Sequence, residues 1–460
     1  MAFESINPAT GQSTATFDNA TANQIDAAIE RLHRGQTRWR STPIDHRSKQ
    51  LRRLADRLLD DRDDHAALIT AEMGKPIAQS ESEIEFCAAI LRYYADHAAE
   101  VLADRRLHHS ERDAMVTHDP IGVLLGVMPW NFPFYQVIRL VAPNLMVGNT
   151  MLIKHAENTP RCAAAATGLF ESVLDDHRVV SNVYAPVDRV ESIIADRRIR
   201  GVSLTGSNRA GSAVAAIAGR FVKPLVLELG GNDPMILCDD VDLDEVVPIA
   251  AEARLVNSGQ SCIAAKRFIV AESIAGAFTD RLATEFAAVR VGDPMDREVR
   301  VGPLSSAAAR DGLANLVDRS VNAGSRLVCG GHRIDRPGYF YEPTILSPIA
   351  PDDPTMDEEF FGPVARVFVA TDDDDAVRIA NASRYGLGGS VFSADAERAS
   401  RIARRIESGM VFVNARCRSS QEIPFGGTKD SGYGRELGDA ALLQFVNAKV
   451  VVGRGEEDEE

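Results

Sequence analysis

The sequence has no apolar run long enough to cross a membrane. A helix that spans a bilayer needs about 20 consecutive apolar residues, and none of the apolar runs in these 460 residues reaches that length. The first residues, MAFESINPATG, have neither the basic nor the apolar region of a secretory signal. We therefore expect a cytoplasmic protein with no membrane partner.

Paired cysteines are also missing. No two of the cysteines have C-x-x-C spacing, which excludes a zinc knuckle and a disulfide framework, so we predict no metal site. Unpaired thiols are typical of a reducing compartment. The cysteines are Cys87, Cys162, Cys238, Cys262, Cys329 and Cys417.

Positive charge is scarce, and lysine in particular. The formal net charge is −15, and only seven residues are lysine. Binding to nucleic acid needs a basic surface, so we expect no nucleic-acid partner. The acidity has two interpretations that stay open: a solvated acidic surface in a protein of arginine-rich composition, or adaptation to a salty cytoplasm that screens surface repulsion.

The chain is long enough for two or three subdomains. Thr21 and Gln24 have the spacing of a capping box before a helical stretch at residues 25–32. A second helical stretch, 48–73, ends at Gly74. From about residue 120, short apolar runs such as VLLGV, MLIK, VSLTG and VLEL alternate with helical segments near 161–174 and 209–219. This alternation predicts βαβ units with a parallel sheet, and a second α/β run follows from about residue 235.

The segment NSGQSC, residues 257–262, contains the most informative cysteine. A single cysteine is more often a buried small residue than a nucleophile. Cys262, however, follows a short polar stretch that contains glycine, as in an exposed loop. A free thiol has a pKa of about 8.5, so about a tenth is thiolate at pH 7.5, and a nucleophilic role requires a nearby activator.

Two further polar residues end apolar runs. Glu228 precedes two glycines in LELGG, and Asn131 lies between aromatic rings in PWNFP. Glu228 is either a carboxylate bonded to local backbone or a general base whose pKa is raised by apolar surroundings. Asn131 is either a turn residue or a donor to a developing oxyanion.

A possible phosphate site follows the VSLTG run. The segment from Thr205 through Gly206 and Ser207 predicts a strand, a small-residue turn and then a helix, which would bring backbone N–H groups to a phosphate. It is not the G-x-G-x-x-G fingerprint. The similar Gly432-Tyr433-Gly434 is not followed by a βαβ unit and is discounted.

Taken in order, these motifs resemble the aldehyde dehydrogenase superfamily over essentially the whole chain, and most of all its bacterial succinate-semialdehyde dehydrogenases. The matching segments are INPATG (6–11), PWNFP (129–133), KHAE (154–157), TGSNRAG (205–211), ELGG (228–231), GQSC (259–262), EEFFGP (358–363) and PFGGTKDSGYGRE (424–436).

The resemblance implies a mechanism. Cys262 attacks the aldehyde, the oxyanion is held by the Asn131 amide and the Cys262 backbone N–H, and a hydride passes to a nicotinamide. Glu228 then activates the water that hydrolyses the thioester. Family members that transfer the acyl group to coenzyme A lack this glutamate, so its presence favours a free acid product.

The resemblance also implies a cofactor site. It assigns the adenosine ribose to Lys154 and Glu157, the nicotinamide ribose to Glu359 and the nicotinamide face to Phe361. The remaining cofactor contacts are Trp130, Gly206 and Ser207. His155 replaces the usual proline. Relatives that use NADP tend to carry a small neutral residue where this chain has Glu157, so we expect NAD to be preferred and NADP to be possible. Glu157 otherwise reads as a carboxylate at a helix start.

The substrate contacts follow from the same resemblance. Arg139 aligns with the arginine that binds the distal carboxylate of succinate semialdehyde, so we expect it to be the main anchor. A second arginine of some relatives is Val256 here. Arg416 and Arg418, followed by Ser419, lie in the segment that lines the substrate mouth, and both arginines are either substrate contacts or solvated.

The family's architecture implies an α/β protein with a Rossmann-type cofactor domain at residues 1–107 and 125–233 and an α/β catalytic domain at 234–425. A small β element at 108–124 and 443–453 would build a homodimer or homotetramer, because an exposed hairpin edge needs covering. Two other functions stay open: oxidation of a different small aldehyde, and a non-catalytic homologue.

Overall fold

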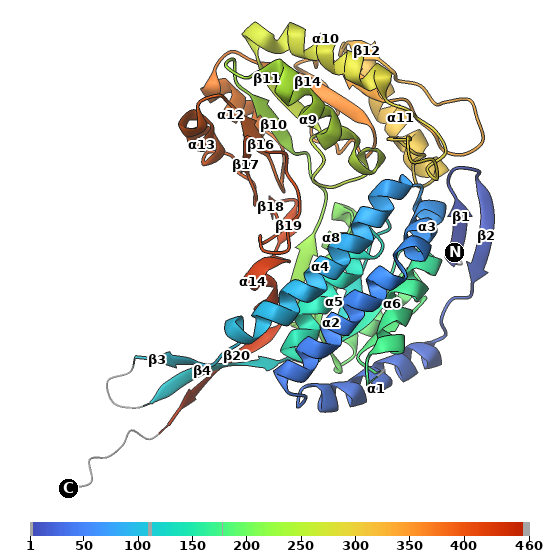
Figure 1. Ribbon diagram of the computed structural model, residues 1–460, viewed down its shortest axis with the longest axis vertical. Helices are drawn as coiled ribbons and strands as arrows, with labels where there is room; N and C mark the ends of the chain where they lie inside the picture. The colour runs from blue at the N-terminus through green and yellow to red at the C-terminus, as the bar shows by residue number, and fades with distance from the viewer. Residues whose placement is uncertain (1–2, 109–112, 177, 454–460) are drawn as a thin grey trace.

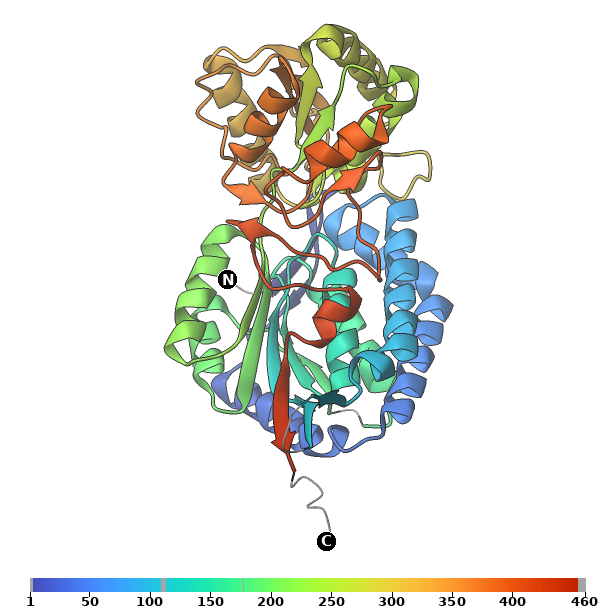
Figure 2. The same ribbon diagram turned by 90° about the vertical axis from the view of Figure 1, so that its left-hand side faces the viewer.

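Two α/β lobes form the frame of the protein, and a small β element projects from one of them (Figure 1). The computed structural model describes residues 3–108, 113–176 and 178–453. Each lobe is built around its own sheet, and the chain crosses between the lobes near its middle and again near its end (Figure 2).

The first lobe contains a sheet of six strands, counted over the described residues, in the order β19-β9-β8-β5-β6-β7. Its strands pair in parallel, except that β19 runs antiparallel to β9. The predicted alternation of strands and helices after residue 120 is therefore confirmed. The strands are β5 (Val123–Val127), β6 (Thr150–Lys154), β7 (Val180–Asn182), β8 (Ile199–Thr205), β9 (Leu225–Glu228) and β19 (Gly432–Tyr433).

Helices cover both faces of this sheet, so its central strands are apolar on both sides. Leu124 and Met151 pack toward one group of helices, whereas Val123 and Leu152 pack toward the other. The first group is α2 (Ile44–Asp60), α3 (Arg62–Met73), α4 (Ile77–Val101), α5 (Tyr135–Val147), α6 (Pro160–Val173) and α14 (Gly438–Leu442). The second is α1 (Ala22–Trp39), α7 (Val190–Ala195) and α8 (Asn208–Arg220), with the 3-10 turn η1 (Val187–Arg189) before α7.

The helix starts and ends agree in part with the sequence. The capping box of Thr21 and Gln24 is present at the start of α1. The single helix expected at 48–73 is instead the pair α2 and α3, which are separated at Asp61. The apolar stripe of α2 is interrupted there by polar residues, so the chain turns to bury the next apolar face. Gly74 ends α3 with a left-handed φ of 82°, as expected.

A hairpin that the sequence did not predict precedes α1. Strands β1 (Phe3–Asn7) and β2 (Gln12–Phe17) pair antiparallel. The Glu4 N–H donates to the Glu157 carbonyl at 3.1 Å, and the buried Phe3 ring lies 5.4 Å from the Lys154 ammonium. The hairpin therefore supports the loop after β6, where two cofactor residues were expected.

The second lobe contains a sheet of seven strands within the part of the chain that is described, in the order β12-β13-β14-β11-β10-β16-β17. Only the pair β12 and β13 is antiparallel. The strands are β10 (Pro234–Leu237), β11 (Arg267–Ala271), β12 (Leu327–Cys329), β13 (Thr344–Leu346), β14 (Val364–Ala370), β16 (Ser390–Phe392) and β17 (Phe412–Val413). Helices α9 (Leu243–Leu255) and α10 (Glu272–Ala288) pack on one face. Helices α12 (Asp373–Asn381) and α13 (Ala396–Ala403) pack on the other, and α11 (Ala307–Asn322) packs beside β13 and β14.

A five-residue link joins the two sheets. The chain leaves β9 at Glu228 and enters β10 at Pro234, and the Ser431 hydroxyl donates to the Gly230 carbonyl in this link at 2.7 Å. A second connection is the two-stranded sheet of β15 (Tyr385–Gly386) and β18 (Thr428–Lys429), which precedes β19. Chain segments from both lobes therefore meet at the end of β9.

The projecting element is a sheet in the order β20-β4-β3, all antiparallel, as far as the described residues go. Its strands are β3 (Arg105–Leu107), β4 (Ala114–Pro120) and β20 (Val446–Val452). The hairpin expected at 108–124 includes residues 109–112, which lie outside the described residues. Val450, Val451 and Val452 on the edge strand are 57%, 43% and 51% exposed. Among residues 3–108, 113–176 and 178–453, no helix has the length and apolarity needed to cross a membrane.

A buried ion pair lies at the N-terminal part of α4, and its carboxylate also binds the start of α5. Lys75 and Glu83 pair with side-chain exposures of 0% and 1%. The second carboxylate oxygen of Glu83 accepts the backbone N–H groups of Phe134 and Tyr135, each at 3.0 Å. The Lys75 ammonium also lies 3.7 Å from the centre of the Phe132 ring. The pair therefore fixes the PWNFP turn, which carries Asn131, against α4.

We predict that Lys75→Met destabilises this lobe by about 3–5 kcal/mol, because it leaves the Glu83 carboxylate buried without a partner. The same change at the exposed Arg52, which pairs with Asp96, is the control and should cost at most about 1 kcal/mol. Both tryptophans, Trp39 and Trp130, belong to this lobe, so urea unfolding followed by tryptophan fluorescence measures the change. Equal shifts in the two variants would contradict the prediction.

Candidate active site

The segment before Cys262 is a tight left-handed turn. After α9, the short turn η2 (Val256–Gly259) holds Asn257 and Ser258 at φ of 53° and 55°, a conformation that is uncommon outside glycine. The turn is held from both sides. The Gln79 side chain accepts the Asn257 N–H at 2.6 Å, and the Ser258 hydroxyl accepts the Gly302 N–H at 2.9 Å.

Arg254 at the end of α9 ties this turn to a second loop. Its fully buried guanidinium donates to the carbonyls of Gly259 at 2.7 Å and of Gly362 at 2.6 Å. A Cβ atom on Gly259 would lie 2.2 Å from the Gly362 oxygen, so only glycine permits this approach. Burial lowers the pKa of Arg254 to about 9. Neither this residue nor its contacts were predicted from the sequence.

The turn leads Cys262 into a cavity of about 710 Å³ between the lobes. The walls come from α4, α5, α9, the end of α10 and residues 416–425. Burial raises the pKa of Cys262 to about 12, and the positive charges of Lys266 and Arg139 act against that increase. Cys262 is therefore a thiol at neutral pH in this state, so the expected need for an activator holds.

Asn131 lies beside the Cys262 loop, as expected. Its buried side-chain NH₂ donates to the Gln260 carbonyl at 3.1 Å, and its own backbone carbonyl accepts from the Asn257 side chain at 2.8 Å. One of the two amide hydrogens remains for another acceptor. The PWNFP turn and the cysteine loop therefore form one hydrogen-bonded unit.

Glu228 ends β9 and is buried, with 2% exposure. Within the described part of the chain, neither of its carboxylate oxygens has a hydrogen-bond partner. Burial raises the pKa of Glu228 well above its ordinary range; the nearby Arg139 acts against this increase, and Glu436 adds to it. An unpartnered buried carboxylate with a raised pKa is typical of a general base.

Arg139 lines the cavity, but its guanidinium is already paired with a buried carboxylate. Its side chain is 1% exposed and forms an ion pair with Glu436. The guanidinium also donates to the hydroxyls of Tyr135 and Thr205, each at 3.2 Å. This pairing differs from the expectation that Arg139 is the main substrate anchor, because a cation already paired with a carboxylate has less attraction left for another.

The three residues expected at the mouth of the cavity do line it. Arg416 forms an ion pair with Glu252 at 3.1 Å. Arg418 is exposed, and among the described residues it has no ion-pair partner. The Tyr135 hydroxyl donates to the Ser419 hydroxyl at 3.0 Å, which leaves the Ser419 hydrogen free to donate into the cavity.

The ends of β6 and β8 have features that suit a dinucleotide. Lys154, which ends β6, is buried, and burial lowers its pKa while the charge of Glu157 acts against this. Ser207 caps α8 by accepting the Ala210 N–H at 3.3 Å. A Cβ atom on Gly206 would meet only a leucine methyl, at 3.7 Å. The start of α8 is therefore open to a phosphate, and these residues fit the cofactor that the sequence implies.

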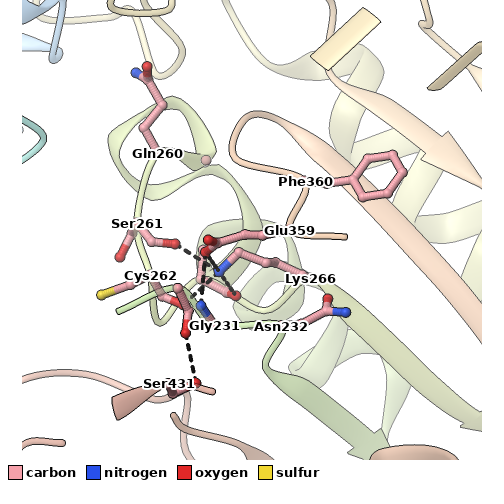
Figure 3. Close-up of polar contacts among 12 residues, drawn as sticks. Gly231, Asn232, Gln260, Ser261, Cys262, Lys266, Glu359, Phe360 and Ser431 are labelled. Atoms are coloured by element: carbon pink, nitrogen blue, oxygen red, sulfur yellow. Dashed lines mark hydrogen bonds and ion pairs between the residues drawn. The ribbon is translucent and has the colours of Figure 1, made fainter. Parts of the chain in front are cut away.

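Two of the residues expected at the nicotinamide end, Glu359 and Phe361, lie in the loop before β14. Trp130 and Phe361, both expected to contact the cofactor, are in edge-to-face contact at 5.7 Å. Glu359 accepts the Gly231 N–H at 3.1 Å and pairs with Lys266 at 3.2 Å (Figure 3). Residues of the β9–β10 link, the cysteine loop and the loop before β14 thus meet at one point.

Sequence reasoning missed four residues of this site: Arg254, Lys266, Glu436 and Tyr135. The strongest signal available was the rarity of lysine, because one of only seven lysines lies four residues after Cys262. Within residues 3–108, 113–176 and 178–453, no group of three or more potential ligands could hold a metal ion.

Comparisons with known proteins agree with this geometry. The model of the aldehyde dehydrogenase family matches residues 1–451. The succinate-semialdehyde dehydrogenase [NADP(+)] of Deinococcus radiodurans is 44% identical, over 98% of this chain and 94% of its own. A probable enzyme of the same name from Synechocystis is 42% identical, over 98% and 99%. The crystal structure of succinic semialdehyde dehydrogenase from Streptococcus pyogenes with NADP⁺ is 40% identical, over 98% and 99%, with a TM-score of 0.96.

Proposed function

The chain belongs to the aldehyde dehydrogenase family, and we propose that it oxidises succinate semialdehyde to succinate with a nicotinamide dinucleotide. The observation that carries this proposal is the cavity that Cys262 and Arg418 line together. A cavity lined by both a nucleophile and a cation suits a short aldehyde that carries a carboxylate. The names of the relatives from Deinococcus radiodurans and Synechocystis support the same substrate.

The oxidation begins with Cys262. The Cys262 thiol first passes its proton to solvent water, a loss that the positive charges of Lys266 and Arg139 favour. The thiolate then attacks the aldehyde carbonyl, and the resulting oxyanion accepts hydrogen bonds from the Asn131 amide and the Cys262 backbone N–H. The bound nicotinamide supplies the acceptor for the hydride that leaves this carbon. The carbonyl then re-forms as a thioester on Cys262, and the two donors keep it in position for the next step.

Hydrolysis of the thioester is the work of Glu228. Its carboxylate takes a proton from water, which attacks the thioester carbon and releases the acid and the thiol. A carboxyl group in water is too weak a base for this step, whereas burial and Glu436 make Glu228 a stronger one. Arg139 limits the increase, so the ion pair of Arg139 with Glu436 tunes the base.

We assign the substrate carboxylate to Arg418 and Ser419. The free hydrogen of Ser419 is directed by Tyr135, whose hydroxyl is in turn held by Arg139. Arg139 therefore acts mainly through Tyr135 and Ser419 in this proposal, rather than as a direct partner. Arg416, paired with Glu252, contributes to the rim of the cavity.

For the cofactor we propose a preference for NAD, with NADP accepted less well. Glu157 accepts hydrogen bonds from the ribose hydroxyls and repels a 2′-phosphate. Two unit charges about 4 Å apart interact by roughly 4 kcal/mol at an effective dielectric of about 20; Lys154 and salt reduce this to an effect of about 10- to 100-fold. The relatives are named for NADP, so this choice depends on Glu157 alone.

We assign a separate function to each lobe and to the projecting β element. We propose that residues 1–107 and 125–233 bind the cofactor, that 234–425 form the catalytic domain, and that 108–124 with 443–453 mediate a homodimer or homotetramer. The exposed valines of β20 support association, as does its outer edge, which pairs with no other strand among the described residues. The six free cysteines support a reducing compartment such as the cytoplasm.

The first prediction about the proposed reaction concerns its dependence on pH. The base must be ionised, so thioester hydrolysis should slow as the pH falls through the raised pKa of Glu228. Glu436→Gln removes a nearby negative charge and frees Arg139, so it should move this decline to lower pH. The measurement is the steady-state rate of NAD(P)H formation from pH 5 to 9.

Two controls accompany this profile. Glu245 is an exposed carboxylate on α9. Glu245→Gln should therefore leave the pH at which the rate declines unchanged. Glu228→Gln should keep a burst of about one NAD(P)H per site and lose the steady state at every pH. A decline that stays in place or moves to higher pH in Glu436→Gln would contradict the assignment.

The second prediction separates the two arginines. Arg418→Ala should raise KM for succinate semialdehyde at least tenfold and leave KM for butanal nearly unchanged, since butanal has no carboxylate to pair. Arg139→Ala should impair both aldehydes by similar factors, because it perturbs Tyr135 and Glu436. The reverse pattern would restore Arg139 as the direct anchor.

The third prediction concerns the cofactor. Glu157→Ser should narrow the gap between NAD and NADP by improving NADP use about tenfold or more, since it removes the charge that repels the 2′-phosphate. The measurement is kcat/KM for both cofactors at fixed ionic strength, in the wild type and the variant. A wild type that favours NADP, or a variant with no gain, would show that Glu157 does not face the ribose.

A further inference from the structure

Lys266 is a buried lysine whose ammonium group donates hydrogen bonds to backbone carbonyl groups. The side chain is fully buried, in the segment between Cys262 and β11. Its ammonium group donates to the carbonyls of Ser261 at 3.0 Å, Cys262 at 2.6 Å and Ala264 at 3.4 Å. Figure 3 shows the Cys262 sulfur on the side facing away from Lys266.

These contacts exclude the simplest chemical role for this lysine. A general base needs a free lone pair, whereas the ammonium group here points its hydrogens at carbonyl oxygens and at Glu359. The contribution of Lys266 must therefore come through the backbone that it holds.

The bond to the Ser261 carbonyl has a geometric consequence at Cys262. The Ser261 C=O and the Cys262 N–H belong to one planar peptide group, and this peptide is not among the cis bonds of the described chain. In a trans peptide the C=O and the N–H point in opposite directions. Lys266 holds the oxygen on its own side, together with the Ala264 N–H, which donates to the same oxygen at 3.2 Å. The Cys262 N–H therefore points to the opposite side, where the sulfur lies.

The Cys262 N–H is also free to act. Among the described residues it donates to no backbone carbonyl and to no side chain. A cation on the oxygen of a peptide polarises the group and strengthens its N–H as a donor. An oxyanion formed at Cys262 needs a polarised N–H that points toward it and donates to no other acceptor. The Cys262 N–H meets these conditions.

We propose that Lys266 is the positioning residue of the oxyanion site, which orients and polarises the Cys262 N–H through the Ser261 carbonyl. The inference rests on the proposed function, because only an addition to a carbonyl forms an oxyanion there. The ion pair of Lys266 with Glu359 extends the same role: it joins the oxyanion site to the loop expected to hold the nicotinamide ribose.

The test compares two reactions of Cys262 in Lys266→Met. Hydride transfer in a single turnover requires both the thiolate and the oxyanion site. Alkylation of Cys262 by iodoacetamide without cofactor, followed by mass spectrometry of the Cys262 peptide, requires the thiolate alone. Both rates scale with the thiolate fraction, so their ratio at one pH cancels the thiolate contribution. With saturating cofactor, the ratio reports on the oxyanion site and its link to Glu359.

Lys223→Met is the matched control. Lys223 also donates to backbone carbonyls, those of Asp196 and Ile199, but lies at the far end of β8 from the cavity. Lys266→Gln, which keeps a shorter neutral donor, should give an intermediate effect and serves if the methionine variant does not fold. Thermal unfolding of each variant reports on its fold.

In Lys266→Met we expect hydride transfer to slow about 100-fold, as for the loss of one oxyanion donor. The ratio of hydride transfer to alkylation should fall at least about tenfold, and Lys223→Met should leave it unchanged. Equal losses in both reactions, or no loss in either, would overturn the proposal. A wild type that forms no NAD(P)H with any aldehyde would instead refute the proposed function.

Discussion

The site depends on two buried cations, Arg254 and Lys266, that donate hydrogen bonds to backbone carbonyl groups. The left-handed turn at residues 257–259 sends several carbonyl groups into the interior, where an unpaired acceptor costs free energy. Arg254 donates hydrogen bonds to the carbonyls of Gly259 and Gly362. Lys266 donates to the carbonyls of Ser261 and Cys262. The turn can therefore persist in an uncommon conformation, and the loop before β14 is held at a fixed distance from Cys262.

A second group of charged residues gives the carboxylates Glu228 and Glu436 different roles. Arg139 pairs with Glu436 and stays close to Glu228, so one cation moderates two buried acids. Glu436 also accepts the Ser203 hydroxyl at 3.1 Å and is thereby fixed, whereas Glu228 keeps both oxygens free in the described structure. Glu228 is therefore the carboxylate of this pair that is available to a water molecule. Arg418, which is exposed and lines the cavity, is the cation that we propose for the substrate carboxylate.

Much of this could be predicted from the sequence, because it depends on local patterns. The alternation of apolar runs and helices after residue 120 is a property of neighbouring residues, and it indicated a parallel sheet correctly. The motifs around Cys262, Glu228 and Asn131 lie where strands or turns end, and the carboxyl ends of parallel strands meet at one edge. Together with the resemblance carried by these motifs, this was enough to indicate the family and its candidate nucleophile, base and oxyanion donor.

The tertiary structure decided what each charged side chain is paired with. Arg139 reads as a free anchor along the chain, yet Glu436, almost three hundred residues later, shares its charge. Lys266 and Arg254 have no motif of their own, because carbonyl groups look alike in every sequence and only their direction makes them ligands. The hairpin of β1 and β2 escaped prediction because it is stabilised by distant contacts with the loop after β6. The sequence by itself determined which groups are present and which strand ends and turns carry the catalytic motifs. The pairing between distant groups, and hence their charge and pKa, required the fold.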